Sequence, residues 1–200
     1  MPTHDTSTQQ PPRRRADAER SIVRILDAAV DALAGDSEAS MAEIARRAGV
    51  VRATIYVHFP TREALLEAVT ERAMAEVVQA IEAVEPHRGD PGEALARVVR
   101  ASWRTLGRFH ALVAINTQQH AHSELRQRHS SVLGTLQPLI ERGQADGSFR
   151  ADVPVAWHLS MLMALMHAAS GEVGAGRVSD DEAERALVAA TIGAVSGGPP

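Results

Sequence analysis

A short stretch that begins at Arg52 carries side chains suited to contact with a nucleic-acid duplex. The guanidinium of Arg52 can donate two parallel N–H groups to a guanine edge, and the small apolar Ala53 and Val57 can meet the methyl group of thymine. The hydroxyls of Thr54 and Tyr56 can reach phosphate oxygens. These contacts require the side chains to project from one rigid element. Whether this stretch binds DNA therefore depends on the secondary structure predicted around it.

Two short helices joined by a glycine turn are predicted around this stretch. Ser40 and Glu43 fit a capping box, in which the serine hydroxyl accepts from the backbone N–H of Glu43 and the carboxylate reaches back to that of Ser40. Gly49 ends the first helix because glycine adopts the left-handed conformation without steric cost. Ile55 and Phe59, four residues apart, give the second helix its buried side. This is the geometry of a helix-turn-helix, whose second helix enters the major groove of DNA.

The sequence EIARRAGVVRATIYVHFPTREAL, residues 43–65, resembles the helix-turn-helix of the TetR family of bacterial transcriptional regulators. Its alanine, glycine, aromatic, histidine and capping positions coincide with the family pattern in order. The resemblance implies a DNA-binding head of three helices, an all-helical ligand-sensing body and a homodimer. It also implies that Tyr56 contacts phosphate, that His58 and Phe59 close the motif, and that Ser40 begins its first helix.

Two positions depart from the commonest pattern of the family. Val51 stands where a serine usually caps the recognition helix, and a valine side chain cannot cap. Arg62 stands where a phosphate-binding lysine is usual, and it keeps the charge. We expect altered local contacts at Val51 and a helix-turn-helix that is otherwise retained.

The charge of the chain is uneven. The net charge is -4, so the protein is not a globally basic nucleic-acid binder. The positions of the arginines matter more than the net charge, because arginines that face one duplex neutralise phosphates and make binding salt-dependent. The arginines expected to do so are Arg13, Arg14, Arg15, Arg46, Arg47, Arg52 and Arg62. Residues 1–16 are rich in Thr, Gln and Pro and are expected to form a disordered arm, either a solvated tail or, through its three arginines, a minor-groove contact.

Composition favours an all-α fold of about nine helices. Of the 200 residues 44% are hydrophobic and only 3% aromatic, and no alternating stretch predicts a strand. The helix-turn-helix domain is predicted at residues 17–62, and a ligand-binding and dimerisation domain at 63–196. Cysteine is absent, which excludes disulfides and thiolate metal sites. No apolar run suits a signal peptide or a membrane span, so we expect a cytoplasmic protein.

Apolar spacing places the helices of the expected body. One is predicted at residues 61–84, and a linker rich in Pro and Gly follows at 85–92. Further helices are predicted from there to about residue 108, in the segment that follows, at 123–145 with a kink at Pro138, at 154–170 and at 180–195. The helix at 154–170 is apolar nearly all round and must be covered on every side. We therefore expect a homodimer formed through the last two helices.

The expected body contains a candidate apolar ligand site, in which methionines adapt to an irregular ligand and a few polar groups orient it. Its candidate residues are Trp103, Leu106, Phe109, His110, Val113, Asn116, Thr117, His120, Met161, Leu162, Met166 and His167. The body histidines leave open a metal-responsive regulator, but His120 and His122 lie on different faces of a helix and no carboxylate joins them at ligand spacing.

An enzyme is not expected, because the sequence holds no phosphate-cradling glycine loop, nucleophile elbow or zinc helix, and no cofactor is expected either. The sequence therefore predicts a homodimeric transcriptional regulator, more specifically a repressor, that binds a palindromic operator on double-stranded DNA and is released by a small molecule. An alternative is a helical ligand-binding adaptor that has lost DNA binding.

Overall fold

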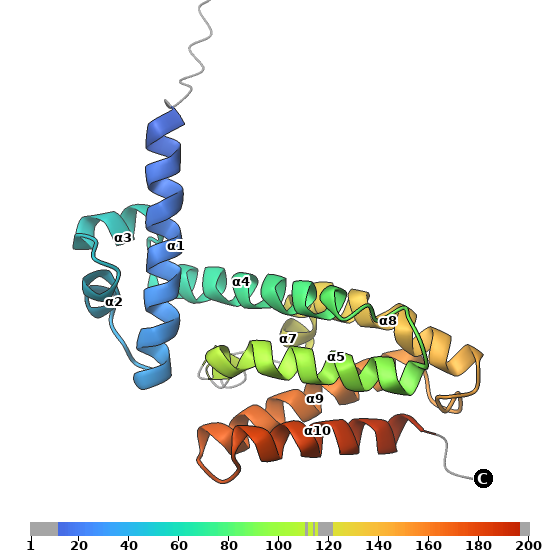
Figure 1. Cartoon of the computed structure of the whole chain (residues 1–200). Helices are drawn as coiled ribbons and strands as arrows, with labels where there is room; N and C mark the ends of the chain where they lie inside the picture. The colour runs from blue at the N-terminus through green and yellow to red at the C-terminus, as the bar shows by residue number, and fades with distance from the viewer. Residues whose placement is uncertain (1–11, 111, 114, 116–121, 197–200) are drawn as a thin grey trace, which may run out of the picture.

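The computed structural model describes residues 12–110, 112–113, 115 and 122–196, and it confirms the all-α prediction. These residues form nine α-helices and one 3-10 helix without any strand, labelled as in Figure 1. A three-helix head lies at one end, the helices of the body lie at the other, and α4 joins the two. None of the described helices combines the length and the apolarity needed to cross a lipid bilayer.

The head consists of α1 (Pro12–Gly35), α2 (Met41–Arg47) and α3 (Arg52–His58). The α1 helix begins at Pro12, inside the segment that was expected to be a disordered arm, and residues 1–11 lie outside the described part of the chain. Proline suits the first turn of a helix because its fixed φ matches and its missing N–H has no intrahelical partner there. The expected arm at Arg13–Arg15 therefore has a helical backbone.

The connecting helix α4 (Arg62–Ala83) is 22 residues, or about 33 Å, long. Thr61 caps its start, with the hydroxyl accepting from the backbone N–H of Ala64 at 3.1 Å. One side of the helix is apolar along its whole length, from Leu65 at the head to Ile81 in the body, and both residues are fully buried. A single rigid element thus contributes to the core of both regions.

The body contains α5 (Pro91–Leu106), η1 (Gly107–Phe109), α7 (His122–Arg128), α8 (Ser130–Ala145), α9 (Val155–Gly174) and α10 (Asp180–Val195). The α4 helix packs on α5 and α8, and α5 also packs on α10. The α9 helix lies against α8 and α10 (Figure 1). Three long helices, α4, α8 and α10, therefore pack against α5.

The helix predicted at 123–145 is two helices. The chain leaves helical geometry at His129, with φ -90° and ψ 6°, and α8 then continues through Pro138 without a break. The His129 ring lies 2.7 Å from the carbonyl of Leu125, which also accepts the backbone N–H of His129. A side chain that competes for a helical carbonyl in this way favours a helix end.

The helix predicted to end at Ser170 continues to Gly174, so Gly171 lies inside it. The residue that ends it is Gly176, which has φ 67°. Its N–H donates to Val173, and that of Arg177 donates to Glu172, which is a Schellman arrangement. A glycine ends a helix where the chain adopts the left-handed conformation, and Gly176 rather than Gly171 does so here.

Candidate functional site

The turn between α2 and α3 has the predicted glycine geometry. Gly49 has φ 64°, and its N–H donates to the carbonyl of Arg46 at 3.2 Å. The N–H of Val50 donates to the carbonyl of Ala45 at 3.0 Å, which completes a Schellman motif. The sequence after Gly49 is therefore directed into a second helix at a fixed angle to the first.

The α3 helix is anchored on one side and open on the other. Ile55 is fully buried and Phe59 is 8% exposed, and together they hold the helix on the core of the head. On the opposite side Val57 is 77% exposed and Tyr56 is 39% exposed. A large apolar side chain with so much of its surface exposed is available for contact with a partner.

The predicted DNA-contacting residues of α3 divide according to this geometry. Arg52, Ala53, Tyr56 and Val57 are exposed together, whereas Thr54 and His58 are half-buried. The guanidinium of Arg52 lies 5.7 Å from the ring centre of Tyr56, within the range of a cation–π contact. This contact holds the arginine against the exposed side of α3, over the tyrosine ring.

Val51 occupies the N-cap position of α3 and makes no side-chain capping bond, as predicted from its side chain. Its backbone is extended, and its carbonyl accepts from the N–H of Thr54 at 2.9 Å. The side chain is 70% exposed beside the exposed face of α3. The loss of a serine cap thus leaves the helix start in place and adds an apolar contact surface.

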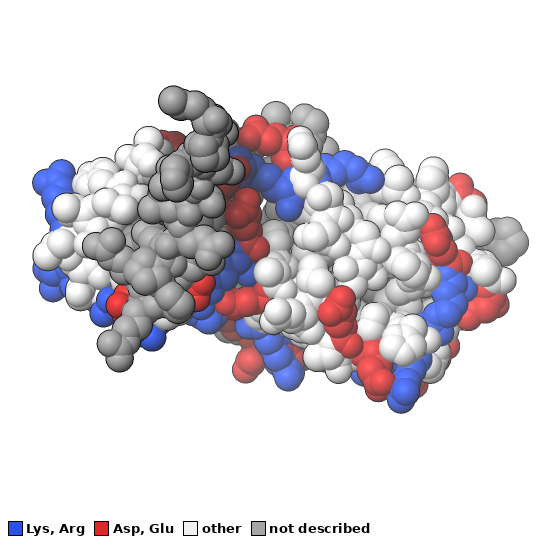
Figure 2. Space-filling view, turned by 90° about the horizontal axis from the view of Figure 1, so that it is seen from above, with Lys and Arg blue, Asp and Glu red and all other residues white. Residues whose placement is uncertain are grey.

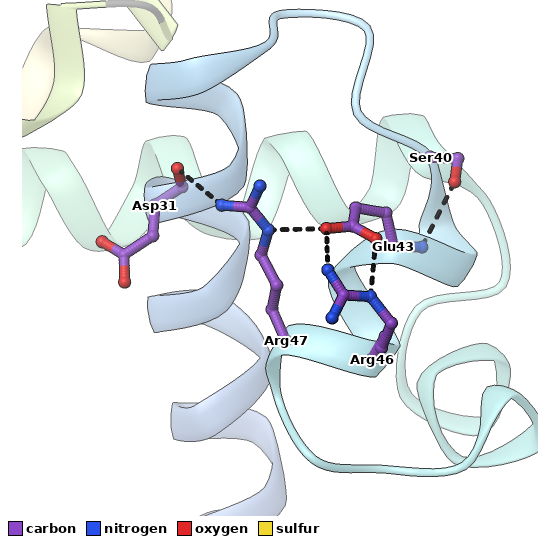
Figure 3. Close-up of polar contacts among 5 residues, drawn as sticks. All are labelled: Asp31, Ser40, Glu43, Arg46 and Arg47. Atoms are coloured by element: carbon purple, nitrogen blue, oxygen red, sulfur yellow. Dashed lines mark hydrogen bonds and ion pairs between the residues drawn. The ribbon is translucent and has the colours of Figure 1, made fainter.

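Glu43 does not complete the predicted capping box at α2. Ser40 caps as predicted, with its hydroxyl accepting from the N–H of Glu43 at 3.2 Å. The carboxylate turns instead to Arg46, at 2.6 and 2.9 Å, and to the Nε of Arg47 at 2.8 Å (Figure 3). Two guanidinium groups outcompete one neutral N–H because charge-assisted hydrogen bonds are stronger.

These bonds change the electrostatics of α2. Hydrogen bonds from Arg46 and Arg47 lower the pKa of Glu43 from 4.5 to about 2, so the carboxylate remains charged in neutral solution. Arg47 also donates to the carbonyl of Asp31 on α1 at 3.3 Å, which ties α2 to its support (Figure 3). Arg46, with 72% of its side chain exposed, is therefore a positioned charge rather than a freely moving one.

Arg62, the remaining predicted contact residue, is half-buried at the start of α4. Its guanidinium donates to the carbonyl of Ser37 at 2.5 Å and so joins the loop between α1 and α2 to α4. Figure 2 shows arginine side chains at the outer end of the head, away from the body. This distribution places positive charge at the end of the molecule that carries α3.

The body contains a partly open cavity of about 70 Å³ between α4, α5, α8, α9 and α10. Its polar lining residues are Ser102, His129, His167 and Thr191. The remaining lining is aliphatic or methionine: Val77, Leu95, Val98, Val99, Val132, Leu133, Leu136, Leu162, Met163, Met166 and Leu187. A mostly apolar cavity with a few converging polar groups is the usual form of a small-molecule site.

The structure brings only some of the predicted ligand residues to this cavity, namely Leu162, Met166 and His167. Leu106 and Phe109 are buried in the core, Val113 and Met161 pack on it, and none of these four lines the cavity. Asn116, Thr117 and His120 lie outside the described residues.

Trp103 and His110 contact Ser170 and Asp180 and do not line the cavity. The Trp103 indole donates to the backbone carbonyl of Asp180 at 3.2 Å, and the His110 ring bridges Ser170 and the Asp180 carboxylate, at 3.2 Å to each. Their two ring centres are 4.7 Å apart. Trp103 thus joins α5 to α10, and His110, which follows η1, joins α9 to α10; neither residue lines the cavity.

Among the cavity residues that were not predicted, only Ser102 and Thr191 could have been recognised from the sequence. Ser102 and Thr191 are polar residues on otherwise apolar helix faces, and they are only 5% and 1% exposed. Buried hydroxyls at such positions often mark either a hydrogen bond within the core or a ligand contact. The aliphatic members carry no such signal, since every core leucine and valine has the same pattern.

The histidines of the described body do not assemble a metal site. No three His, Asp or Glu side chains in the described part of the chain lie close enough together to hold an ion. The rings of His129 and His167 meet edge to face, with centres 5.1 Å apart. Burial lowers the pKa of His129, which therefore stays neutral at physiological pH.

An ion network connects the head to the body. Arg72 of α4 lies 2.8 Å from Asp27 of α1 and 3.0 Å from Glu76 of its own helix. Arg108 of η1 approaches both carboxylates at 3.6 Å. One cluster therefore spans α1, α4 and η1, and a displacement of α4 relative to either region must alter it.

Two known protein families match this chain, one over the head and one over the body. A family described as "Bacterial regulatory proteins, tetR family" matches residues 25–69, and one described as "Tetracyclin repressor-like, C-terminal domain" matches residues 91–176. The transcriptional repressor NicS of Pseudomonas putida is 30% identical over 164 residues, or 77% of each chain. The repressor LfrR of Mycolicibacterium smegmatis is 31% identical over 150 residues, or 75% of this chain and 77% of LfrR.

Solved structures agree with the sequence relatives. A crystal structure of LfrR in complex with proflavine has a TM-score of 0.69 at 26% identity and covers 90% of this chain and 99% of LfrR. FadR from Bacillus subtilis in complex with stearoyl-CoA has a TM-score of 0.70 over 86% of this chain and 98% of FadR, and at 22% identity it supports the fold alone. With its helix-turn-helix and its matched C-terminal domain, the chain belongs to the TetR family of bacterial regulatory proteins and is a DNA-binding transcriptional regulator.

Proposed function

We propose that this regulator is a repressor that binds a palindromic operator as a homodimer and releases it when a small molecule enters the body. The observation that carries the proposal is the exposed side of α3, where Arg52, Ala53, Tyr56 and Val57 project from a helix anchored by Ile55. Arg52 reads a guanine, the two apolar side chains meet thymine methyl groups, and the tyrosine hydroxyl contacts phosphate.

The dimer in this proposal forms through α9 and α10. On α9 the exposed residues Trp157, Ala164, Ala168 and Gly171 recur at spacings of a single helical stripe. Trp157 is 64% exposed, which is unusual for so large an apolar side chain outside an interface. The exposed α10 residues Ala186, Ala190 and Gly193 form a second stripe of small side chains. Two such stripes let the helices of two copies approach closely around a two-fold axis.

Release follows from the position of the cavity. Val77 of α4 forms part of its wall, so a molecule that enlarges the cavity displaces the helix that leads to the head. The cluster of Asp27, Arg72, Glu76 and Arg108 then transmits the displacement to α1. The effector shifts the equilibrium only by its different affinity for the two states, so it binds free protein more tightly than operator-bound protein. The relative LfrR, whose structure holds proflavine, supports a ligand-responsive body.

The experiment is selection of random duplexes by the purified protein at near-physiological salt, followed by affinity measurements on the recovered sequence. We expect a palindrome. Arg52→Ala should weaken binding to it by about 1 to 3 kcal/mol and relax the sequence preference, whereas Tyr56→Phe should weaken all duplexes alike. Arg88→Ala, at an exposed arginine between α4 and α5, serves as the control and should leave binding unchanged. Equal losses on selected and random DNA for Arg52→Ala would remove its base-reading role, and retention of no sequence would favour the adaptor alternative.

A further inference from the structure

The tautomer of His129 is fixed by its neighbour. Its Nδ1 lies 2.7 Å from the carbonyl oxygen of Leu125, and a carbonyl can only accept a hydrogen bond. Nδ1 therefore carries the proton. In a neutral imidazole the other nitrogen, Nε2, is then an unprotonated acceptor on a ring that lines the cavity. A ring that lines the cavity thus carries an acceptor with which a donor on the occupant can pair.

The described wall of the cavity holds no charged side chain that could pair with an ionised group. Its described lining contains no arginine, aspartate or glutamate, and the polar members are two hydroxyls and two imidazoles. An isolated carboxylate or phosphate would lose its hydration there without gaining a cation, which is strongly unfavourable. The site therefore selects against fatty-acid, acyl-CoA and nucleotide anions whose charged end must enter it.

The size of the cavity limits the occupant further. Its volume of about 70 Å³ is less than the roughly 150 Å³ of an apolar cavity known to hold benzene. Met163 and Met166 line the wall, and unbranched methionine side chains can change rotamer to enlarge a site. A single substituted ring is thus an occupant that the wall can accept by local rearrangement, and it must push the wall outward to enter.

We infer that the effector is an uncharged, mainly apolar molecule of about one aromatic ring, with a hydroxyl or N–H group that donates to Nε2 of His129. The inference rests on the proposed function in taking this cavity as the effector site. It goes further by stating the charge, the size and the hydrogen-bonding sense of the molecule.

Three probes that share a propyl-substituted ring test the inference on the full-length protein by isothermal titration calorimetry. 4-Propylphenol is neutral and has a donor, 4-propylanisole lacks the donor, and 4-propylbenzoate is an anion. We expect the phenol to bind about tenfold more tightly than the anisole, because the anisole leaves a buried acceptor unpaired. The benzoate should not bind measurably. Binding of the benzoate equal to that of the phenol, or no binding of the phenol at its solubility limit, overturns the inference.

His129→Asn is the informative variant. The asparagine amide occupies the place of Nδ1 and can still donate to Leu125, but it has no group in the place of Nε2. We expect the variant to lose the preference for phenol over anisole, whereas His87→Asn, at an exposed loop histidine, should keep it. A preserved preference in His129→Asn refutes the role of Nε2.

A spectroscopic measurement on the wild type keeps the test decisive if the variant does not fold. In ¹⁵N NMR of the histidine side chains, donation from the phenol to Nε2 of His129 should move its resonance upfield, and the anisole should not. An unmoved resonance in the phenol complex overturns the inference.

A parallel titration of the selected operator separates the two proposals. Phenol binding by a protein that binds no operator would contradict the proposed function alone, and operator binding with tight benzoate binding would contradict the effector class alone.

Discussion

Two glycines of α8 provide a matched test of how the turn after this helix is packed. A Cβ atom built on Gly143 would lie 2.1 Å from Cδ2 and 2.4 Å from Cε2 of Phe149, whereas one built on Gly134 meets no atom within 4 Å. The Phe149 ring is 3% exposed. Its backbone cannot easily shift, because its N–H donates to the carbonyl of Gly143 at 2.8 Å. The Gly143→Ala substitution must therefore displace the ring.

The magnitudes follow from two opposing effects. Replacing a helical glycine with alanine stabilises a helix by about 1 kcal/mol. Loss of a buried phenylalanine ring costs about 3 to 5 kcal/mol. We expect Gly143→Ala to lower the free energy of unfolding by about 2 to 4 kcal/mol and Gly134→Ala to raise it by up to about 1 kcal/mol.

The assay is urea unfolding monitored by circular dichroism at one fixed protomer concentration, because association with a second copy would add to apparent stability. A second substitution, Phe149→Leu, should recover part of the loss in the Gly143→Ala background, since the smaller side chain makes room for the new methyl group. If Gly143→Ala is as stable as the wild type, the close packing of Phe149 on α8 is refuted.

Three further predictions concern charge and assembly. Glu43, whose pKa is lowered to about 2, contributes stability that is present above about pH 4.5 and is lost as the pH falls towards 2. Glu43→Gln should therefore show a flatter loss of stability over that range in acid-dependent unfolding, and equal slopes would contradict the pairing. Asp27→Asn removes the ion pair of Arg72 between α1 and α4. It should cost about 1 kcal/mol or less in unfolding, and it should reduce the effect of the effector on operator affinity in gel-shift titrations. An unchanged effector response would remove the network from the release mechanism. Trp157→Arg, on the exposed stripe of α9, should shift the protein to monomers in analytical ultracentrifugation, and a retained dimer would place the interface elsewhere.

The head was predictable because its signals are local. Ser40 and Thr61 cap helices through bonds that reach only three residues along the chain, and both do so in the structure. Gly49 turns the chain by its own backbone conformation. One local prediction was wrong, the direction of the Glu43 carboxylate, because its own capping position and two arginines compete for it.

Helix ends in the body were less predictable. The break at His129 depends on a ring that donates to a carbonyl one turn earlier, which apolar spacing does not reveal. Gly171 and Gly176 are the same residue type, and only the backbone conformation at Gly176 ends α9. The N-terminal helix likewise extends to Pro12 although the composition there is typical of disorder.

The sequence by itself determined the all-helical class and the helix-turn-helix with its exposed Arg52 and Tyr56, because both rest on periodicity or on bonds between near neighbours. It also indicated the family, because residues 43–65 form one contiguous motif that resembles the family pattern. The cavity was decided by tertiary structure alone. Ser102, His129 and Thr191 come from distant parts of the chain, and the side of a helix that faces a cavity depends on its rotation against its neighbours. The same rotation turns Trp103 towards α10 and away from the cavity, since packing among α5, α9 and α10 fixes the angle of each helix about its axis.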